Sequence, residues 1–197
     1  MLEWRLWGVR CRVSLLFPAL VTALLLWKPD GLAISCLLAS LIHEGGHLAA
    51  MLAMGVSPKD CVLGAFGMRL ELGNSLVGYG RNLVIALAGP LANGLAAILL
   101  FIANSPMIAA IHLALAGLNL LPVGALDGGE VLRCGFGLLG LDGFVEPMLR
   151  FFSAVVLLPL ATAGAWLLLR MENPTLIIIS VYLVALIFFL DKCEKTS

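Results

Sequence analysis

The segment from Leu32 to Met54 reads LAISCLLASLIHEGGHLAAMLAM, an apolar run interrupted by one polar cluster at His43, Glu44 and His47. Its length suits a membrane-crossing helix, which needs about 20 predominantly apolar residues. Ionisable side chains at that depth cost about 2.5 kcal/mol or more each on insertion scales, so a cluster of three needs a compensating partner. The segment therefore predicts a membrane helix that carries a polar site, and a divalent cation is the partner that we expect.

The polar cluster His43-Glu44-Gly45-Gly46-His47 has the form HExxH. Residues four apart project from one face of a helix, so the two imidazoles can share one zinc ion. Glu44 then stands where a general base takes a proton from the attacking water without binding the metal. The alternative is a polar lock, in which the histidines bond to neighbouring helices and Glu44 is protonated.

Composition places the whole chain in a membrane. Of its 197 residues, 61% are hydrophobic and 12% are charged, far from the balance of a soluble domain. The polar stretches are too short to form a separate soluble core, so we expect a single domain over residues 1–197. A formal net charge of zero argues against nucleic acid as a partner. The five cysteines lie far apart in the sequence, and their number is odd, so we interpret them as reduced thiols rather than as a disulfide framework.

Apolar runs along the chain predict an all-α polytopic membrane protein with about six transmembrane helices. The first run is interpreted as a retained helix because no signal-peptide cleavage site follows it. The expected spans are residues 13–27, 32–54, 82–103, 107–121, 148–169 and 174–190.

Basic residues predict the orientation of these spans. If the N-terminus is cytoplasmic, ten Lys and Arg residues fall on the cytoplasmic side, and only Lys28 and Arg170 fall on the other. The positive-inside rule then favours a multi-pass protein of the cell membrane with both termini in the cytoplasm.

The segment between the second and third spans, residues 57–80, is too polar to cross a bilayer. Apolar residues recur at alternate positions between Val62 and Leu72, as in a strand with one apolar face. We expect a short strand or hairpin at the cytoplasmic interface, although an amphipathic loop fits the pattern equally. Such a strand, over residues 61–72, could pair with an unwound substrate segment.

A catalytic zinc site needs a third protein ligand, and the candidates within the spans are Cys36, His112 and Asp127. Pro122 and several glycines break the helix before Asp127, and non-helical backbone at membrane depth is tolerated where it lines a protein cavity. Depth also favours Asp127 over His112, because His47 lies only about 10 Å from the cytoplasmic end at 1.5 Å per residue. An ordinary cytoplasmic loop with an Asp-Gly turn is the alternative for this stretch.

These motifs resemble the site-2 protease family of membrane metallopeptidases, which pairs HExxH with an NxxP…DG signature in a later helix. Here that signature is Asn119, Pro122 and Asp127-Gly128, and the third span adds the similar segment from Ala88 to Asn93, AGPLAN. By this resemblance Asn119, with Pro122 beside it, would position the substrate or the oxyanion, whereas a helix–helix hydrogen bond is the alternative. For Asn93, close helix packing is favoured over catalysis.

Within that family the chain looks most like the branch containing the sporulation stage IV FB protease, because it has six expected spans and no PDZ insertion. Members of that branch often carry a nucleotide-sensing CBS domain, which this sequence does not include. The resemblance suggests a membrane-tethered transcription-factor or sigma-factor precursor as substrate, and regulatory membrane proteins as possible partners.

The sequence thus predicts an intramembrane endopeptidase with one zinc ion per chain, which cleaves a membrane-associated protein near the cytoplasmic side. His43, His47 and Asp127 are the expected metal ligands, and Glu44 is the expected base. Two other classes remain open, a divalent-metal transporter and a catalytically silent membrane scaffold. A transporter usually shows internal repeats or acidic relays, and neither is seen in the sequence.

Overall fold

The structure, a computed structural model, describes residues 2–6, 9–13, 31–56, 58–64, 67–72, 78–124 and 126–171, together with 177, 180, 181 and 184. They fall into two compact units, Met1–Leu118 and Asn119–Ser197, and each is described by itself. The spans expected at 13–27 and 174–190 lie almost entirely outside the described residues.

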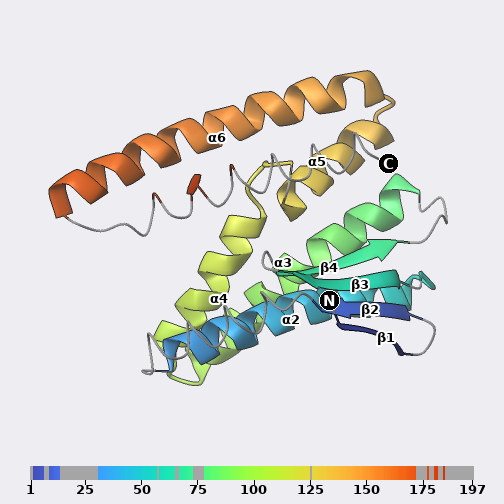
Figure 1. Cartoon of the computed structure of the whole chain (residues 1–197), viewed down its shortest axis with the longest axis horizontal. Helices are drawn as coiled ribbons and strands as arrows, with labels where there is room; N and C mark the ends of the chain where they lie inside the picture. The colour runs from blue at the N-terminus through green and yellow to red at the C-terminus, as the bar shows by residue number, and fades with distance from the viewer. Residues whose placement is uncertain are drawn as a thin grey trace. The chain divides into compact units, whose positions relative to one another are not determined.

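Within the described part of the chain, three helices are long and apolar enough to cross a membrane: α2 (Leu32–Ala53), α3 (Tyr79–Ile102) and α6 (Asp142–Met171). A shorter apolar helix, α4 (Pro106–Asn119), follows α3 after a tight turn (Figure 1). These helices coincide with four of the expected spans, since long apolar runs form helices wherever backbone groups must be satisfied internally.

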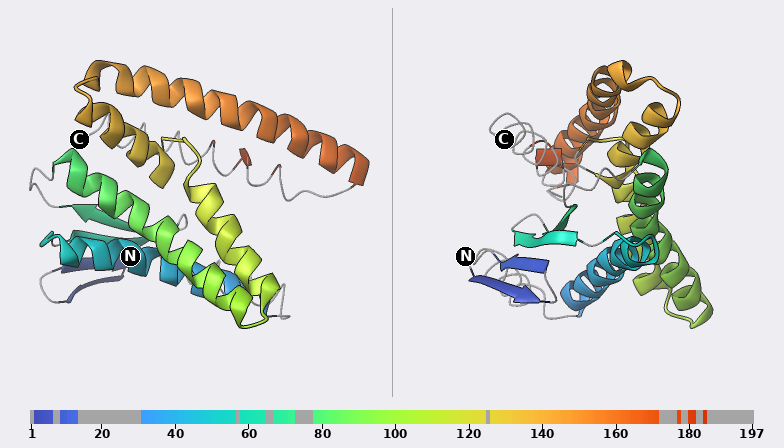
Figure 2. Two further views of the ribbon diagram at one scale, coloured as in Figure 1. Left: turned by 180° about the vertical axis from the view of Figure 1, so that it is seen from behind. Right: turned by 90° about the vertical axis from the view of Figure 1, so that its right-hand side faces the viewer.

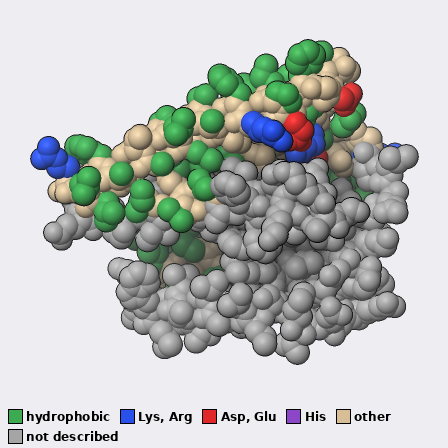
Figure 3. All heavy atoms as spheres, turned by 45° about the horizontal axis from the view of Figure 1, so that its top comes forward, with side chains coloured by type: hydrophobic (Ala, Val, Ile, Leu, Met, Phe, Trp, Pro, Cys, Tyr) green, Lys and Arg blue, Asp and Glu red, His purple; other side chains and the backbone are tan. Residues whose placement is uncertain are grey.

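The apolar surface of α6 points outward along its length, and only 6% of the most apolar 18-residue stretch of this helix is buried. Figure 3 shows hydrophobic side chains distributed along this helix. Phe144, Leu158 and Leu169 are among the most exposed. A helix with such a surface needs an apolar surrounding, and lipid supplies one.

A four-stranded sheet accompanies the helices of the first unit. Its order is β1-β2-β3-β4, with antiparallel pairing between β1 and β2 and between β3 and β4, and parallel pairing between β2 and β3. The strands are β1 (Leu2–Leu6), β2 (Val9–Val13), β3 (Pro58–Gly64) and β4 (Gly67–Leu72).

Strands β3 and β4 occupy the segment between α2 and α3 where a strand or hairpin was considered, and β4 lies at an edge of the sheet. The pair β1 and β2 was not expected, so the all-α fold class was incomplete. A signal was present, because apolar and basic residues alternate from Val9 to Val13.

A further helix, α5 (Asp127–Leu138), follows the short connection after α4 and was also not expected. Its sequence, DGGEVLRCGFGL, is rich in glycine, which lowers intrinsic helix propensity by about 1 kcal/mol per residue relative to alanine. Asp127 and Glu130 stand in its first turn, where negative charge is favoured by the helix dipole.

Helices α2 and α3 pack with their backbones in close contact (Figure 2). A Cβ atom on Gly46 of α2 would lie 2.5 Å from the carbonyl oxygen of Ala88 and 2.8 Å from Cβ of Ala92, both in α3. Small residues at a helix interface allow this approach in membrane proteins. Met51, Val56 and Ile85 form a buried cluster beside the contact.

Candidate metal centre

His43 and His47 lie together on one face of α2, as the HExxH spacing predicts. Their Nε2 atoms are 3.2 Å apart, and His43 is only 4% exposed. The nitrogens of two histidines bound tetrahedrally to one zinc ion, at about 2.0–2.1 Å each, are separated by about 3.3 Å. The described geometry of the pair therefore fits a shared zinc ion.

The orientation of His47 is fixed from α3. Its Nδ1 atom lies 2.7 Å from the carbonyl oxygen of Ile85. A carbonyl oxygen only accepts hydrogen bonds, so Nδ1 of His47 carries a hydrogen, and in the neutral ring Nε2 then keeps its lone pair. Pro90 in α3 has no N–H to donate, which interrupts the regular helix ladder next to the Ile85 carbonyl.

Gly89 of α3 provides the space in which the two imidazoles sit. A Cβ atom at this position would collide with Nε2 of His47 and would lie 2.9 Å from Cε1 of His43. The conformation of Gly89 is helical, so its role here is close approach rather than backbone freedom. Any other residue would displace the nitrogen atoms that are expected to bind the metal.

Two buried polar residues support His43 from behind. Nδ2 of Asn93, in α3, lies 3.4 Å from Nδ1 of His43, and Nδ1 of His112, in α4, lies 3.0 Å from Oδ1 of Asn93. Asn93 is 0% exposed and His112 is 2% exposed. His112, considered from the sequence as a rival ligand, thus reaches His43 through Asn93. Asn93 does more than pack, because its amide contacts an expected ligand.

Glu44 and Asn119 belong to different units, because the boundary between the units falls just before Asn119. Glu44 follows His43 on α2 and is half-buried, and Asn119 is the last residue of α4 and is also half-buried. Pro122 lies in the connection between α4 and α5 and is half-buried too. The sequence-predicted roles of these three residues remain predictions.

Asp127, in the second unit, is the first residue of α5 and is half-buried. The two residues after it are buried glycines. A Cβ atom on Gly128 would collide with the carbonyl oxygens of Leu120 and Leu121, and one on Gly129 would collide with the carbonyl oxygen of Val123. The Asp-Gly-Gly sequence therefore lets the start of α5 fold directly against the chain that leaves α4.

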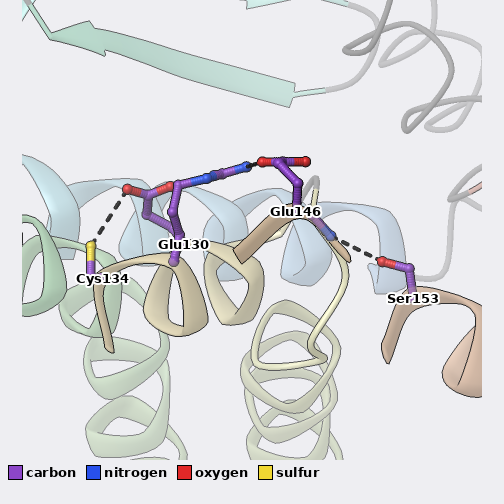
Figure 4. Close-up of polar contacts among 6 residues, drawn as sticks. Glu130, Cys134, Glu146 and Ser153 are labelled. Atoms are coloured by element: carbon purple, nitrogen blue, oxygen red, sulfur yellow. Dashed lines mark hydrogen bonds and ion pairs between the residues drawn. The ribbon is translucent and has the colours of Figure 1, made fainter. Parts of the chain in front are cut away.

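Polar contacts hold α5 in place within the second unit (Figure 4). Arg133 binds Glu130 at 2.8 Å and Glu146 of α6 at 3.4 Å, and the backbone N–H of Gly124 donates to Oγ of Ser153 at 3.3 Å. The thiol of buried Cys134 donates to Glu130 at 3.6 Å. Burial, and then the charge of Glu130, raise the pKa of Cys134 to about 12, so this thiol stays protonated at neutral pH.

Comparison with known proteins defines the class of fold. No protein-family model matches the sequence, and no curated protein matches it. Among solved structures, the chain is similar to a site-2 protease from Methanocaldococcus jannaschii, with a TM-score of 0.67 and 20% sequence identity. The similarity covers 92% of this chain and 91% of that one. The chain therefore has the fold of a site-2 protease over nearly its whole length.

Proposed function

We propose that this protein is an intramembrane zinc-dependent endopeptidase of the site-2 protease family. The observation that carries the proposal is the histidine pair of an HExxH helix, with Nε2 atoms 3.2 Å apart, inside a fold similar to that of a site-2 protease. Gly89 gives this pair its space, and Ile85 orients one of its members.

The proposed ligands are His43, His47 and Asp127, a donor set that could hold a metal ion. Two imidazole nitrogens and one carboxylate oxygen are the donors of several catalytic zinc sites, which keep a fourth position open for water or substrate. One zinc ion per chain would supply Lewis-acid activation of the attacking water and of the substrate carbonyl.

Glu44 is the proposed general base. Its carboxylate takes a proton from the water that attacks the peptide carbonyl carbon, and then returns that proton to the nitrogen of the leaving amine. In this proposal the side-chain amide of Asn119 donates to the oxygen that becomes negative during the attack. Pro122 follows three residues after the end of α4, where a proline disfavours continuation of the helix beyond Asn119.

The proposed substrate is a membrane-associated protein, cut near the cytoplasmic side of the cell membrane. A helical peptide must unwind before water can reach its carbonyl, and β4 offers an edge on which an extended segment could add as a further strand. The placement of basic residues supports cytoplasmic termini. A transcription-factor or sigma-factor precursor, as in the sporulation branch, and regulation by other membrane proteins are parts of the same proposal.

Co-expression with candidate membrane-tethered precursors tests the proposal. The native chain should give a shortened product, and Glu44→Gln should lower cleavage by about 10²- to 10⁴-fold, the usual contribution of a general base, while zinc content is kept. Asp142→Asn, the same kind of change at an exposed carboxylate of α6, is the matched control and should cleave normally.

Three outcomes separate this proposal from its rivals. Unchanged cleavage by Glu44→Gln would sink the proposed mechanism. Zinc uptake into vesicles without any cleavage would favour a transporter. Zinc binding with neither uptake nor cleavage, across all precursors of the organism, would favour a scaffold.

A further inference from the structure

A line of four polar side chains runs through the first unit, from the carbonyl of Ile85 to His112. Its contacts join His47 to Ile85 at 2.7 Å, His43 to His47 at 3.2 Å, Asn93 to His43 at 3.4 Å, and His112 to Asn93 at 3.0 Å. Asn93 and His112 are 0% and 2% exposed, so bulk water cannot readily replace a missing bond at either.

The direction of each bond follows from its partners when a hydrogen atom lies between the two Nε2 atoms. Ile85 accepts from Nδ1 of His47, so Nε2 of His47 must accept from Nε2–H of His43. Nδ1 of His43 then has only a lone pair, and it accepts from the amide Nδ2 of Asn93. Oδ1 of Asn93 in turn accepts from Nδ1–H of His112, so every group in the line has one consistent role.

A metal ion between the two histidines requires the opposite direction. Nε2 of His43 must then offer its lone pair, so the hydrogen of its neutral ring moves to Nδ1. Nδ1–H needs an acceptor, and the only one that Asn93 can offer is Oδ1, which its amide presents by turning over. The Nδ2 group then faces His112, whose Nδ1 must accept, and the hydrogen of His112 moves to Nε2.

We propose that Asn93 and His112 are positioning residues for the metal centre, and that metal binding reverses the line of hydrogen bonds from His43 out to His112. This inference rests on the proposed zinc site, but not on the reaction that the site performs. The three histidines carry the same number of protons in both arrangements, so the change is one of tautomer and amide orientation. A ligand whose Nδ1–H is bonded to a fixed acceptor is better oriented and more basic.

Histidine tautomers measured by ¹⁵N NMR test the proposal directly. The chain contains only three histidines, so ¹⁵N-histidine labelling of the full-length protein in micelles gives three ring systems, assigned by single substitutions. Zinc suits this measurement because it is diamagnetic. On zinc addition, His112 should change from the Nδ1–H to the Nε2–H tautomer. If His43 and His47 respond to zinc while the tautomer of His112 stays unchanged, the proposal is overturned.

Substitution of Asn93 gives an independent test, read as zinc affinity in competition with a chelator. Asn93→Asp leaves only acceptor oxygens beside Nδ1 of His43, so it should bind zinc as tightly as the native chain or more tightly. Asn93→Leu removes the acceptor and should weaken binding about 10- to 100-fold, the usual effect of losing a ligand's supporting partner. Asn82→Leu, the same change elsewhere in α3, is the matched control and should leave affinity unchanged.

Equal losses in Asn93→Asp and Asn93→Leu would indicate a merely structural role and would overturn the inference. If Asn93→Leu does not fold, the NMR measurement on the native chain still decides. Cleavage in the presence of zinc with no difference among the Asn93 variants would overturn this inference and leave the proposed function standing. The expected affinity shifts without any cleavage would support this inference and overturn the proposed function. Absence of zinc binding by the native chain would overturn both.

Discussion

The histidine pair and the start of α5 place their expected metal ligands by different physical means. His43 and His47 sit on a regular helix, and side-chain contacts from α3 and α4 orient them. Asp127 stands where a helix begins, and the close contact of Gly128 with backbone carbonyls sets the path of the chain. The comparison teaches that the ligands of one proposed metal site can be positioned in two ways. Side-chain hydrogen bonds orient the histidines, whereas close backbone packing at a glycine positions Asp127.

Removal of the Asp127 carboxylate should have the largest effect, because it deletes a proposed ligand rather than a supporting group. We expect Asp127→Ala to weaken zinc binding by more than about 100-fold, the upper end of the losses from supporting residues. Chelator competition measures the affinity. Asp142→Ala, at the start of α6, is the control for loss of an acidic residue in a first helical turn. Full zinc retention by Asp127→Ala would remove Asp127 from the ligand set.

Gly89→Ala should weaken zinc binding by about 10- to 100-fold, comparable to the loss of a group that orients a ligand. The added Cβ would collide with Nε2 of His47 and force the ring away from its position. Gly94→Ala is the matched control in the same helix, because a Cβ there meets nothing within 4 Å. Equal zinc affinity of the two variants would show that the histidines have room to move.

Gly128→Ala should lower the free energy of unfolding, because its Cβ would collide with the carbonyl oxygens of Leu120 and Leu121, which are backbone atoms and cannot rotate away. Overpacking of this kind costs about 1–3 kcal/mol. Gly135→Ala in the same helix has open space and should instead stabilise by about 0.4–1 kcal/mol. Thermal unfolding of the two variants in the same detergent checks the prediction. A stabilised Gly128→Ala protein would mean that the start of α5 is loosely packed.

The smallest expected effect concerns the pH dependence of stability at Cys134. Its pKa of about 12 lies above the ordinary value of 9.0, so between these pH values the folded thiol keeps a proton that the unfolded chain releases. The free energy of unfolding should therefore fall as pH rises through this window. Cys134→Ala should show a shallower fall in melting temperature than the native chain. Identical pH profiles would show that the buried thiol makes no contribution.

The sequence was sufficient to predict the parts of the fold that follow from long apolar runs. Helices α2, α3, α4 and α6 coincide with expected spans because a bilayer-length apolar segment has few alternatives to a helix. Helix α5 was missed because its glycines, which allow close packing, also lower its helical propensity. The strands β1 and β2 were missed because β2 pairs with β3, a segment far from it in the sequence, and this long-range pairing places the β1–β2 hairpin in the sheet.

The candidate site also has a part that the sequence predicts and a part that it does not. The HExxH spacing predicts the histidine pair because only the periodicity of one helix is involved. The carbonyl of Ile85 has no sequence signature, since every residue carries a carbonyl group. His112 was weighed as a ligand, and its contact with Asn93 depends on how α4 packs against α3. No pattern within either helix specifies that packing.

Each of the two helices of the histidine site contacts the other through a glycine. Gly46 of α2 lies against Ala88 and Ala92, while Gly89 of α3 lies against the imidazoles of α2. A larger side chain on either helix would change the spacing that the other requires. Redesign of this centre for a different metal would therefore need substitutions chosen in pairs across the interface, and single changes near either glycine would be poor starting points for laboratory evolution.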